Sequence, residues 1–288
     1  MKFIVADSVA FGMEGFQDLG SVRLVPEAEI GPETVQEADV VVTRSKTRLM
    51  PDLFRGSAAR FAGTCTAGID HADPEGLQES GIHFVYAPGC NANAVSEYVL
   101  AALLESGQKL RGKTVGIIGH GEVGIRVDRK LTAVGCRVLR SDPPREKRGA
   151  KGPYVPLETV VQESDIVTLH VPLVEDGPTP TRNLLGAEQI SRLKPGALLL
   201  NACRGEALDA EAACAARSAG ALSWLVLDVW DPEPGIPPLQ LAAADVGTPH
   251  IAGHSVEGKV NGTRQIREAV IAHFGLDADV WDPEPLMP

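Results

Sequence analysis

Short apolar runs alternate with amphipathic segments along almost the whole chain. In the first ninety residues, runs typical of strands occupy residues 3–6, 22–25, 40–42, 61–63 and 84–86. Further runs of this kind occupy residues 114–118, 137–140, 166–170, 197–201, 222–227 and 245–247. Parallel strands need a crossover connection, usually a helix, and the amphipathic segments supply it. The pattern therefore predicts an α/β protein built on parallel sheets.

The strands fall into two sets, separated by a break at Pro88-Gly89-Cys90-Asn91. Helices are predicted at residues 94–106, 123–133, 157–163, 187–193, 209–218 and 256–274, the first with Asn93 as its N-cap. The first set of strands suits a small flavodoxin-like sheet, and the second suits a doubly wound dinucleotide-binding domain. We therefore expect two Rossmann-like domains with a cleft between them. They are a substrate-binding (catalytic) domain of residues 1–92 and 257–288, and an NAD-binding domain of residues 93–256.

A glycine-rich turn follows the first strand of the second set. It reads Gly119-His120-Gly121-Glu122-Val123-Gly124, and a predicted helix opens from it. In a strand–turn–helix, this spacing permits a tight turn, a close approach to pyrophosphate, and close packing of helix on strand. At the end of the next strand, Asp142 is placed to accept hydrogen bonds from the ribose of NAD and to repel the extra phosphate of NADP. Arg140 and Arg145 would suit NADP, which remains the alternative cofactor.

Three later strand ends each offer one ionisable group: Arg204, Glu233 and His250. Open α/β sheets bind ligands at the carboxyl ends of their strands, so we expect the three side chains to meet beside the nicotinamide. A histidine exchanges a hydroxyl proton near neutral pH, and a carboxylate beside it raises its pKa. An arginine binds a carboxylate with two hydrogen bonds. The set predicts hydride transfer at the hydroxyl-bearing carbon of a small acid.

Composition narrows the possible partners. The formal net charge is −11 and no cluster of lysine and arginine is longer than Arg145-Glu146-Lys147-Arg148, so nucleic acid is an unsuitable partner. No apolar stretch has the length of a membrane span, and none resembles a secretory signal. The five cysteines are scattered without a C-x-x-C spacing, which favours reduced thiols in the cytoplasm. We expect a cytoplasmic protein.

Two other catalytic classes can be considered for the segment that follows His250. Gly253-His254-Ser255-Val256-Glu257-Gly258 approaches the nucleophile elbow of hydrolases, but its second glycine comes one place late. His250 and His254 have the i, i+4 spacing of metal ligands, but no third ligand accompanies them, so no metal is expected. A nucleotide-sensing scaffold, resembling a corepressor, is the alternative outside enzymes, although it would not need Arg204, Glu233 and His250 together.

The chain resembles the D-2-hydroxyacid dehydrogenases, and among them the 4-phosphoerythronate dehydrogenases. The likeness rests on Gly63-Thr64-Cys65-Thr66-Ala67-Gly68-Ile69-Asp70-His71, Ala87-Pro88-Gly89-Cys90-Asn91-Ala92, Ser141-Asp142-Pro143-Pro144-Arg145, Asn201-Ala202-Cys203-Arg204-Gly205 and Gly247-Thr248-Pro249-His250-Ile251-Ala252-Gly253. It implies an NAD-dependent enzyme acting on a small anionic 2-hydroxy or 2-keto acid. It also implies a homodimer built around the helix near residues 94–106.

The resemblance assigns roles to single residues. It implies His250 as proton donor and acceptor, Glu233 as its partner, and Arg204 as the clamp for the substrate carboxylate. Substrate contacts are implied at Ser45, Thr66, Gly68 and His254. Cofactor contacts are implied at Gly119, Gly121, Glu122, Val123, Gly124, Asp142, Val171, Ala202, Cys203, Asp228 and Gly253. The turn that contains Arg44, Ser45 and Lys46 is a candidate site for a distal phosphate or phosphonate.

Three departures from the resembled enzymes concern the substrate and the cofactor. His254 replaces a tyrosine that contacts substrate, and Val171 replaces a threonine that contacts the cofactor. Those enzymes carry a further C-terminal dimerisation domain, which we do not expect in this protein. A different 2-hydroxy acid of a secondary pathway is therefore an alternative to a 4-phosphoerythronate-like substrate. The segment 229–234 recurs at 280–285, where we expect a packed or frayed tail.

Overall fold

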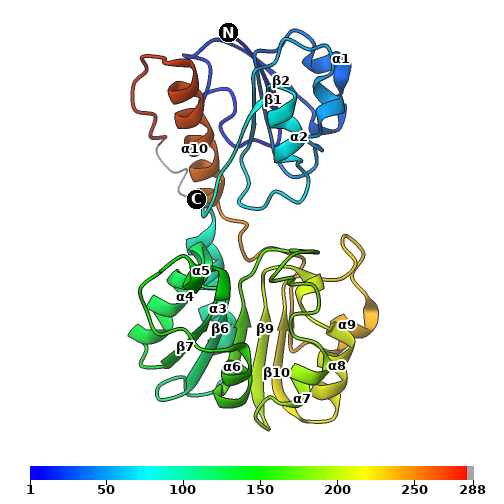
Figure 1. Cartoon of the computed structure of the whole chain (residues 1–288), viewed down its shortest axis with the longest axis vertical. Coiled ribbons are helices and arrows are strands. Elements are labelled where there is room, and N and C mark those ends of the chain that lie inside the picture. Colours follow the sequence, from blue (N-terminus) through cyan, green and yellow to red (C-terminus); the bar gives the residue numbers. More distant parts are fainter. Residues whose placement is uncertain (284–288) are drawn as a thin grey trace. The chain divides into compact units, whose positions relative to one another are not determined.

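The computed structural model describes residues 1–283, which form two compact units (Figure 1). The first unit contains Met1–Asn91 and the segment that begins at Ser255, and the second contains Ala92–His254. Each unit is a parallel sheet with helices, so the predicted class of two parallel-sheet α/β domains is confirmed. The unit bounds lie close to the domain bounds expected from the sequence.

The first unit has a five-stranded parallel sheet in the order β2-β1-β3-β4-β5. Its strands are β1 (Lys2–Ala6), β2 (Ser21–Val25), β3 (Val40–Thr43), β4 (Phe61–Thr64) and β5 (His83–Tyr86). Its helices are α1 (Pro32–Val35), α2 (Pro74–Glu79) and α10 (Val256–Phe274), with 3-10 turns η1 (Glu27–Glu29) and η2 (Pro51–Phe54). The strand order is that of flavodoxin-like sheets, in which ligands bind at the carboxyl ends of the strands.

The last long helix, α10, covers one face of this first sheet, as its sequence position predicted. Ile266 and Val270 are fully buried against Phe61 and the alternate apolar residues of β1 and β3. A Cβ atom on Gly63 would lie 2.6 Å from Ile266 Cγ2, so glycine in β4 is what lets the helix approach the strand closely. Arg267, 2% exposed, forms a 2.6 Å ion pair with Asp18 beside this core.

The second unit has a six-stranded parallel sheet in the order β11-β10-β9-β8-β6-β7. Its strands are β6 (Thr114–Ile118), β7 (Arg137–Ser141), β8 (Ile166–Leu169), β9 (Ala197–Asn201), β10 (Leu222–Leu227) and β11 (Val246–Gly247). Every residue of β8 and β9 is buried, as expected of strands covered by helices on both faces. Beyond β7, where doubly wound domains continue the sheet, Val155 N–H donates to Arg140 O at 2.9 Å.

Helices connect the strands of this second sheet. They are α3 (Ala92–Glu105), α4 (Glu122–Ala133), α5 (Pro143–Lys147), α6 (Leu157–Glu163), α7 (Ala187–Ser191), α8 (Ala210–Ser218) and α9 (Pro238–Ala243), with the 3-10 turn η3 (Gly205–Ala207). The predicted N-cap at Asn93 was wrong, because α3 begins at Ala92 and the Asn93 amide donates to Glu97. Sequence reasoning missed α5 and α9, whose prolines resemble turn signals but are also favoured in the first helical turn.

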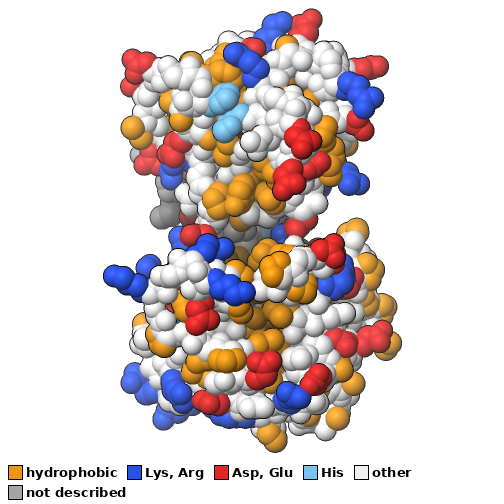
Figure 2. Space-filling view, viewed as in Figure 1, with side chains coloured by type: hydrophobic (Ala, Val, Ile, Leu, Met, Phe, Trp, Pro, Cys, Tyr) orange, Lys and Arg blue, Asp and Glu red, His pale blue; other side chains and the backbone are white. Residues whose placement is uncertain are grey.

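The C-terminal repeat packs on the first unit as far as the structure describes it. Trp281 meets the ring of Phe11 edge-on at 6.2 Å, and Asp282 pairs with Arg264. Glu284 and Pro285 of the repeat lie outside the described residues. Lysine, arginine, aspartate and glutamate side chains are interspersed on the visible faces of both units (Figure 2). Within residues 1–283, no helix combines the length and apolar character needed to cross a membrane.

Candidate active site and dinucleotide site

The glycine-rich turn joins β6 to α4, and its three glycines have three different surroundings. Gly119 adopts φ +87°, a left-handed conformation that favours glycine. A Cβ atom on Gly124 would lie 2.1 Å from the Gly119 carbonyl oxygen, so this glycine is required for packing. At Gly121 a Cβ atom would meet no atom of the described residues within 4 Å, which leaves the backbone open to a ligand. These are the three roles that dinucleotide binding requires of the motif.

A cavity of about 480 Å³ lies beside this turn. Gly119, Gly121, Asp142 and Val171 line it, together with Arg148. The open side of Gly121 and the N-terminus of α4 could offer backbone N–H groups to phosphates, and Asp142 could accept hydrogen bonds from ribose hydroxyls. The residues present therefore fit a dinucleotide. Of the predicted cofactor contacts, Glu122 and Val123 open α4, whereas Ala202, Cys203, Asp228 and Gly253 lie at the strand ends around His250.

Asp142 is held in place by two backbone donors. Its Oδ2 accepts from His120 N–H at 2.8 Å, and its Oδ1 accepts from Arg145 N–H at 2.9 Å as the N-cap of α5. Arg140, whose presence favoured NADP, instead forms a 2.6 Å ion pair with Asp128. The structure thus separates the Arg140 charge from the carboxylate that we assign to the ribose.

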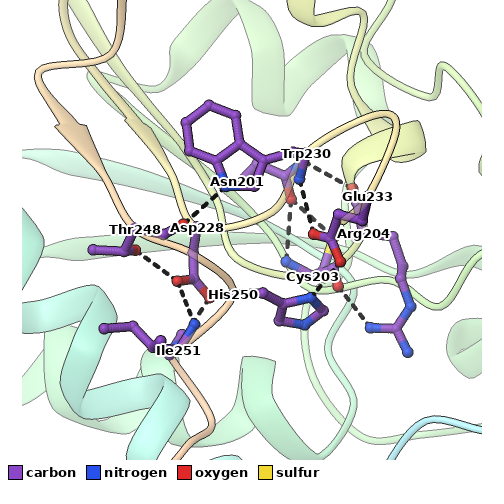
Figure 3. A network of polar contacts seen from close by, with 10 residues as sticks. Asn201, Cys203, Arg204, Asp228, Trp230, Glu233, Thr248, His250 and Ile251 are labelled. Carbon is purple, nitrogen blue, oxygen red and sulfur yellow. Dashed lines mark hydrogen bonds and ion pairs between the residues drawn. The ribbon is translucent and has the colours of Figure 1, made fainter. Parts of the chain in front are cut away.

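Arg204, Glu233 and His250 lie close together at neighbouring strand ends, as the sequence predicted (Figure 3). His250 Nδ1 is 2.8 Å from Glu233 Oε2, and Glu233 Oε1 also accepts from Trp230 N–H at 3.0 Å. Arg204 is near enough for its charge to lower the pKa of both partners. The site therefore holds a cation, a carboxylate and an imidazole within one polar network.

The pair of Glu233 and His250 is electrostatically coupled. The hydrogen bond with Glu233 raises the pKa of His250 above its ordinary 6.5, against the opposing effects of burial and of Arg204. Burial raises the pKa of Glu233, but the hydrogen bond and charge of His250 outweigh it and hold this pKa below 4.5. The coupling therefore favours an ionised Glu233 beside a protonated His250.

Asp228, predicted near the nicotinamide, is fully buried beneath the His250 turn. Its Oδ1 accepts from Ile251 N–H at 2.8 Å and from the Thr248 hydroxyl at 2.6 Å, and its Oδ2 accepts from Ala252 N–H at 2.9 Å. His250 has φ +55° in this turn, which is rare for a residue with a side chain. Asp228 thus stabilises the unusual backbone that presents the histidine.

The turn that carries Arg204 is fixed by Asn201. The Asn201 side chain donates to Arg204 O at 2.8 Å and accepts from Cys203 N–H at 3.1 Å, while Arg204 Nη1 donates to Cys203 O at 2.7 Å. A Cβ atom on Gly205 would lie 2.0 Å from Trp230 O. Glycine at this position therefore allows the turn after β9 to touch the turn after β10, which brings Arg204 beside Glu233.

The predicted substrate contacts of the first unit lie at the carboxyl ends of β3 and β4, which pair in parallel. Arg44, Ser45 and Lys46 follow β3, and Ser45 and Lys46 are exposed. Thr66 follows β4 and donates to Gly68 O at 2.8 Å, so these two residues shape one turn. His254, the remaining predicted contact, is exposed at the end of the second unit.

Sequence reasoning missed the residues that support these turns. Glu27, 7% exposed, accepts from Lys46 N–H at 2.9 Å and from Thr47 N–H at 3.1 Å, which fixes the turn after β3. Tyr98 on α3 is 2.5 Å from the Thr248 hydroxyl and continues the Asp228 network. Both contacts join residues far apart in the chain and have no spacing to reveal them. Among the described residues, no group of three or more histidine, cysteine, aspartate or glutamate side chains is arranged to hold a metal.

Comparisons with known proteins agree with this geometry. Residues 94–252 match the family described as D-isomer specific 2-hydroxyacid dehydrogenase, NAD binding domain. The erythronate-4-phosphate dehydrogenase of Klebsiella pneumoniae is 45% identical over 279 residues, which cover 96% of this chain and 74% of that protein. The enzyme of the same name from Salmonella arizonae is 45% identical over 284 residues, covering 97% and 75%.

Solved structures share the fold. The TT0316 protein from Thermus thermophilus superposes with a TM-score of 0.81 at 26% identity, covering 96% of this chain and 97% of that one. A D-lactate dehydrogenase from Aquifex aeolicus, complexed with NAD and lactic acid, superposes with a TM-score of 0.77 at 22% identity over 95% of both chains. With the dinucleotide site and the family match together, the chain belongs to the NAD-dependent D-isomer specific 2-hydroxyacid dehydrogenases.

Proposed function

We propose that Arg204, Glu233 and His250 catalyse hydride transfer at C2 of a 2-hydroxy or 2-keto acid. The contact between His250 Nδ1 and Glu233 Oε2, at 2.8 Å, is the observation that carries the proposal. It fixes the ring so that Nε2 is the nitrogen that exchanges a proton with the substrate hydroxyl. NAD, when bound, supplies the acceptor for the hydride.

Each residue of the trio has a separate task in this scheme. In the oxidation direction His250 takes the hydroxyl proton, and Glu233 stabilises the imidazolium that forms. Arg204 binds the substrate carboxylate and polarises the adjacent carbonyl as it develops. Asp228 holds the His250 turn through three hydrogen bonds. In the reduction direction, His250 gives the proton back.

Substitution of the histidine tests this assignment. His250→Gln keeps a polar side chain but removes the titrating ring, and we expect turnover to fall by about 100-fold or more, the scale of general acid–base catalysis. The reduced-nicotinamide absorbance reports turnover, and NAD titration reports cofactor binding, which is expected to stay near its original value. Near-normal turnover in this variant contradicts the assignment.

We further propose that the substrate carries a distal phosphate or phosphonate, as in 4-phosphoerythronate. The relatives named erythronate-4-phosphate dehydrogenase support this, as does the turn of Arg44, Ser45 and Lys46. Glu27 fixes that turn by accepting hydrogen bonds from the backbone amides of Lys46 and Thr47. These bonds use backbone groups, so the side chains of Arg44 and Lys46 can bind an anion. In this proposal Ser45, Thr66 and the backbone near Gly68 also contact the substrate.

A substrate panel tests the distal group. Turnover is measured with 2-hydroxy acids that differ only in the presence of phosphate or phosphonate. The double variant Arg44→Ala/Lys46→Ala is expected to raise KM for the phosphorylated acid about tenfold or more while leaving the unphosphorylated acid unaffected, because each charged hydrogen bond contributes on the order of 1.5–3 kcal/mol. Arg55→Ala, which removes an exposed cation paired with Asp52 in the same unit, is the control. A general preference for unphosphorylated acids rejects the proposal.

We propose in addition that the enzyme works as a cytoplasmic homodimer associated through α3. All five cysteines are free, as suits a reducing compartment. Leu104 on α3 is 57% exposed, an apolar surface that a second copy would cover. Light scattering of the purified protein and of Leu104→Lys tests the dimer. The proposal requires a dimer for the original protein and a larger monomer fraction for the variant.

A further inference from the structure

A buried carboxylate on α4 contacts two other parts of the second unit, the glycine-rich turn and β7. Asp128 is 7% exposed. Its Oδ2 is 3.0 Å from His120 Nε2 in the glycine-rich turn and accepts from Arg140 Nε on β7 at 2.6 Å. Its Oδ1 accepts from the Thr132 hydroxyl at 3.1 Å on its own helix. The dehydrogenase mechanism assigns no task to this group.

The hydrogen-bond partners of Asp128 favour its charged form. Burial raises the pKa of Asp128, but the hydrogen bonds from His120 and Arg140 outweigh it and hold this pKa far below the ordinary 3.8. The second ring nitrogen of His120, Nδ1, is 3.2 Å from the Tyr154 hydroxyl, and the two rings meet edge-on at 5.8 Å. His120 is thus held at both nitrogens. Removing Asp128 would leave a partly buried arginine without its counter-ion.

The backbone of His120 links Asp128 to Asp142, the carboxylate that we assign to the ribose. The same residue whose ring meets Asp128 donates its N–H to Asp142 Oδ2 at 2.8 Å. Gly119 N–H donates to Ser141 O at 2.8 Å, so the turn and the end of β7 are joined at two points. Arg140 lies two residues before Asp142, and its charge is compensated by Asp128.

We propose that Asp128 is a positioning residue that sets the preference for NAD over NADP. It does so in two ways: it fixes Asp142 through His120, and it binds the Arg140 cation that would otherwise attract a 2′-phosphate. The inference rests on the proposed role of Asp142 toward the ribose. A carboxylate held in one place accepts from the hydroxyls of NAD and repels the phosphate of NADP, whereas a mobile one does both less well.

Binding of both cofactors to the substrate-free protein tests the proposal. Dissociation constants for NAD and NADP are measured by calorimetry on protein stripped of nucleotide. Asp128→Asn is expected to weaken NAD about tenfold, the scale of one charge-assisted hydrogen bond, and to leave NADP unchanged or tighter. The dissociation constant for NADP divided by that for NAD then falls at least tenfold. An equal change in both constants, or no change in either, overturns the proposal.

Three further variants separate the steps. Thr132→Val removes one donor to the Asp128 carboxylate and leaves the contacts of His120 and Arg140 in place. The ratio of its NADP and NAD dissociation constants is expected to stay unchanged. Adding Arg140→Gln to Asp128→Asn is expected to abolish any gain in NADP affinity and, because it removes the uncompensated charge, to restore folding if the single variant loses it. Asp142→Ala tests the underlying assignment by itself. If its ratio equals that of the original protein, the ribose role of Asp142 fails first.

Discussion

Replacing Glu233 by glutamine removes one charge from the active site and keeps the side-chain shape. Glutamine retains an oxygen that can accept from Trp230 N–H, so the turn is expected to keep its conformation. At the 2.8 Å separation of His250 Nδ1 and Glu233 Oε2, Coulomb's law with the dielectric constant of water gives about 1.5 kcal/mol. The side chains are 46% and 36% exposed, so screening reduces this value. Measured exposed pairs retain about 1 kcal/mol or less. Losing this attraction in Glu233→Gln lowers the pKa of His250.

Two measurements report this change. The ascending limb of kcat/KM against pH for oxidation is expected to move to lower pH in Glu233→Gln, because unprotonated His250 is the base. Stability follows the linkage of both groups. The raised pKa of His250 stabilises the fold below 6.5 and loses this contribution as pH rises through the folded value. The lowered pKa of Glu233 contributes above 4.5 and is lost as pH falls. The melting temperature of Glu233→Gln is therefore expected to fall furthest below that of the original protein between pH 4.5 and pH 6.5.

Asp231→Asn is the matched control. It removes the same charge from the same turn, but Asp231 is exposed and lies 3.9 Å from Arg182, away from His250 in the hydrogen-bond network. Its limb is expected to stay in place. If Glu233→Gln leaves the limb unmoved, or moves it no more than Asp231→Asn does, the pairing does not tune His250 and the reasoning is refuted.

Three other outcomes follow from the geometry. Gly124→Ala is expected to lower the melting temperature by several degrees because its Cβ would meet a carbonyl at 2.1 Å, while Gly121→Ala keeps the melting temperature and weakens NAD in a binding titration. Thr248→Val removes a donor to buried Asp228, and we expect kcat to fall about tenfold with little change in KM; an unchanged kcat contradicts the role of Asp228. Partial desolvation, together with His83 and Arg60, lowers the pKa of His273, so stability is expected to fall as pH drops below 6.5, and the pH dependence of unfolding is expected to flatten in His273→Asn.

Local patterns were enough to predict the strands of the second sheet and the groups at their carboxyl ends. Strands such as β9 are continuous apolar runs because both faces are covered, and α10 has the bounds predicted for it. The trio was predictable because each member closely follows a strand, and parallel strands place their carboxyl ends at one edge. The glycine spacing likewise states a backbone requirement that only a strand–turn–helix meets.

The supporting contacts were not predictable in this way, because they join residues distant in sequence through side chains of ordinary type. In the sequence, Asp128 is an ordinary polar residue of an amphipathic helix. Only the fold brings His120 and Arg140 into contact with it. Asp228 likewise stabilises a turn about twenty residues later in the chain. No residue pattern predicts the positive φ of His250 in that turn. The sequence by itself determined which chemical groups line the strand ends, since strand periodicity and glycine requirements are local. Only the tertiary structure decided which buried carboxylates hold those groups in place, since a buried charge is stable only where the fold supplies its donors.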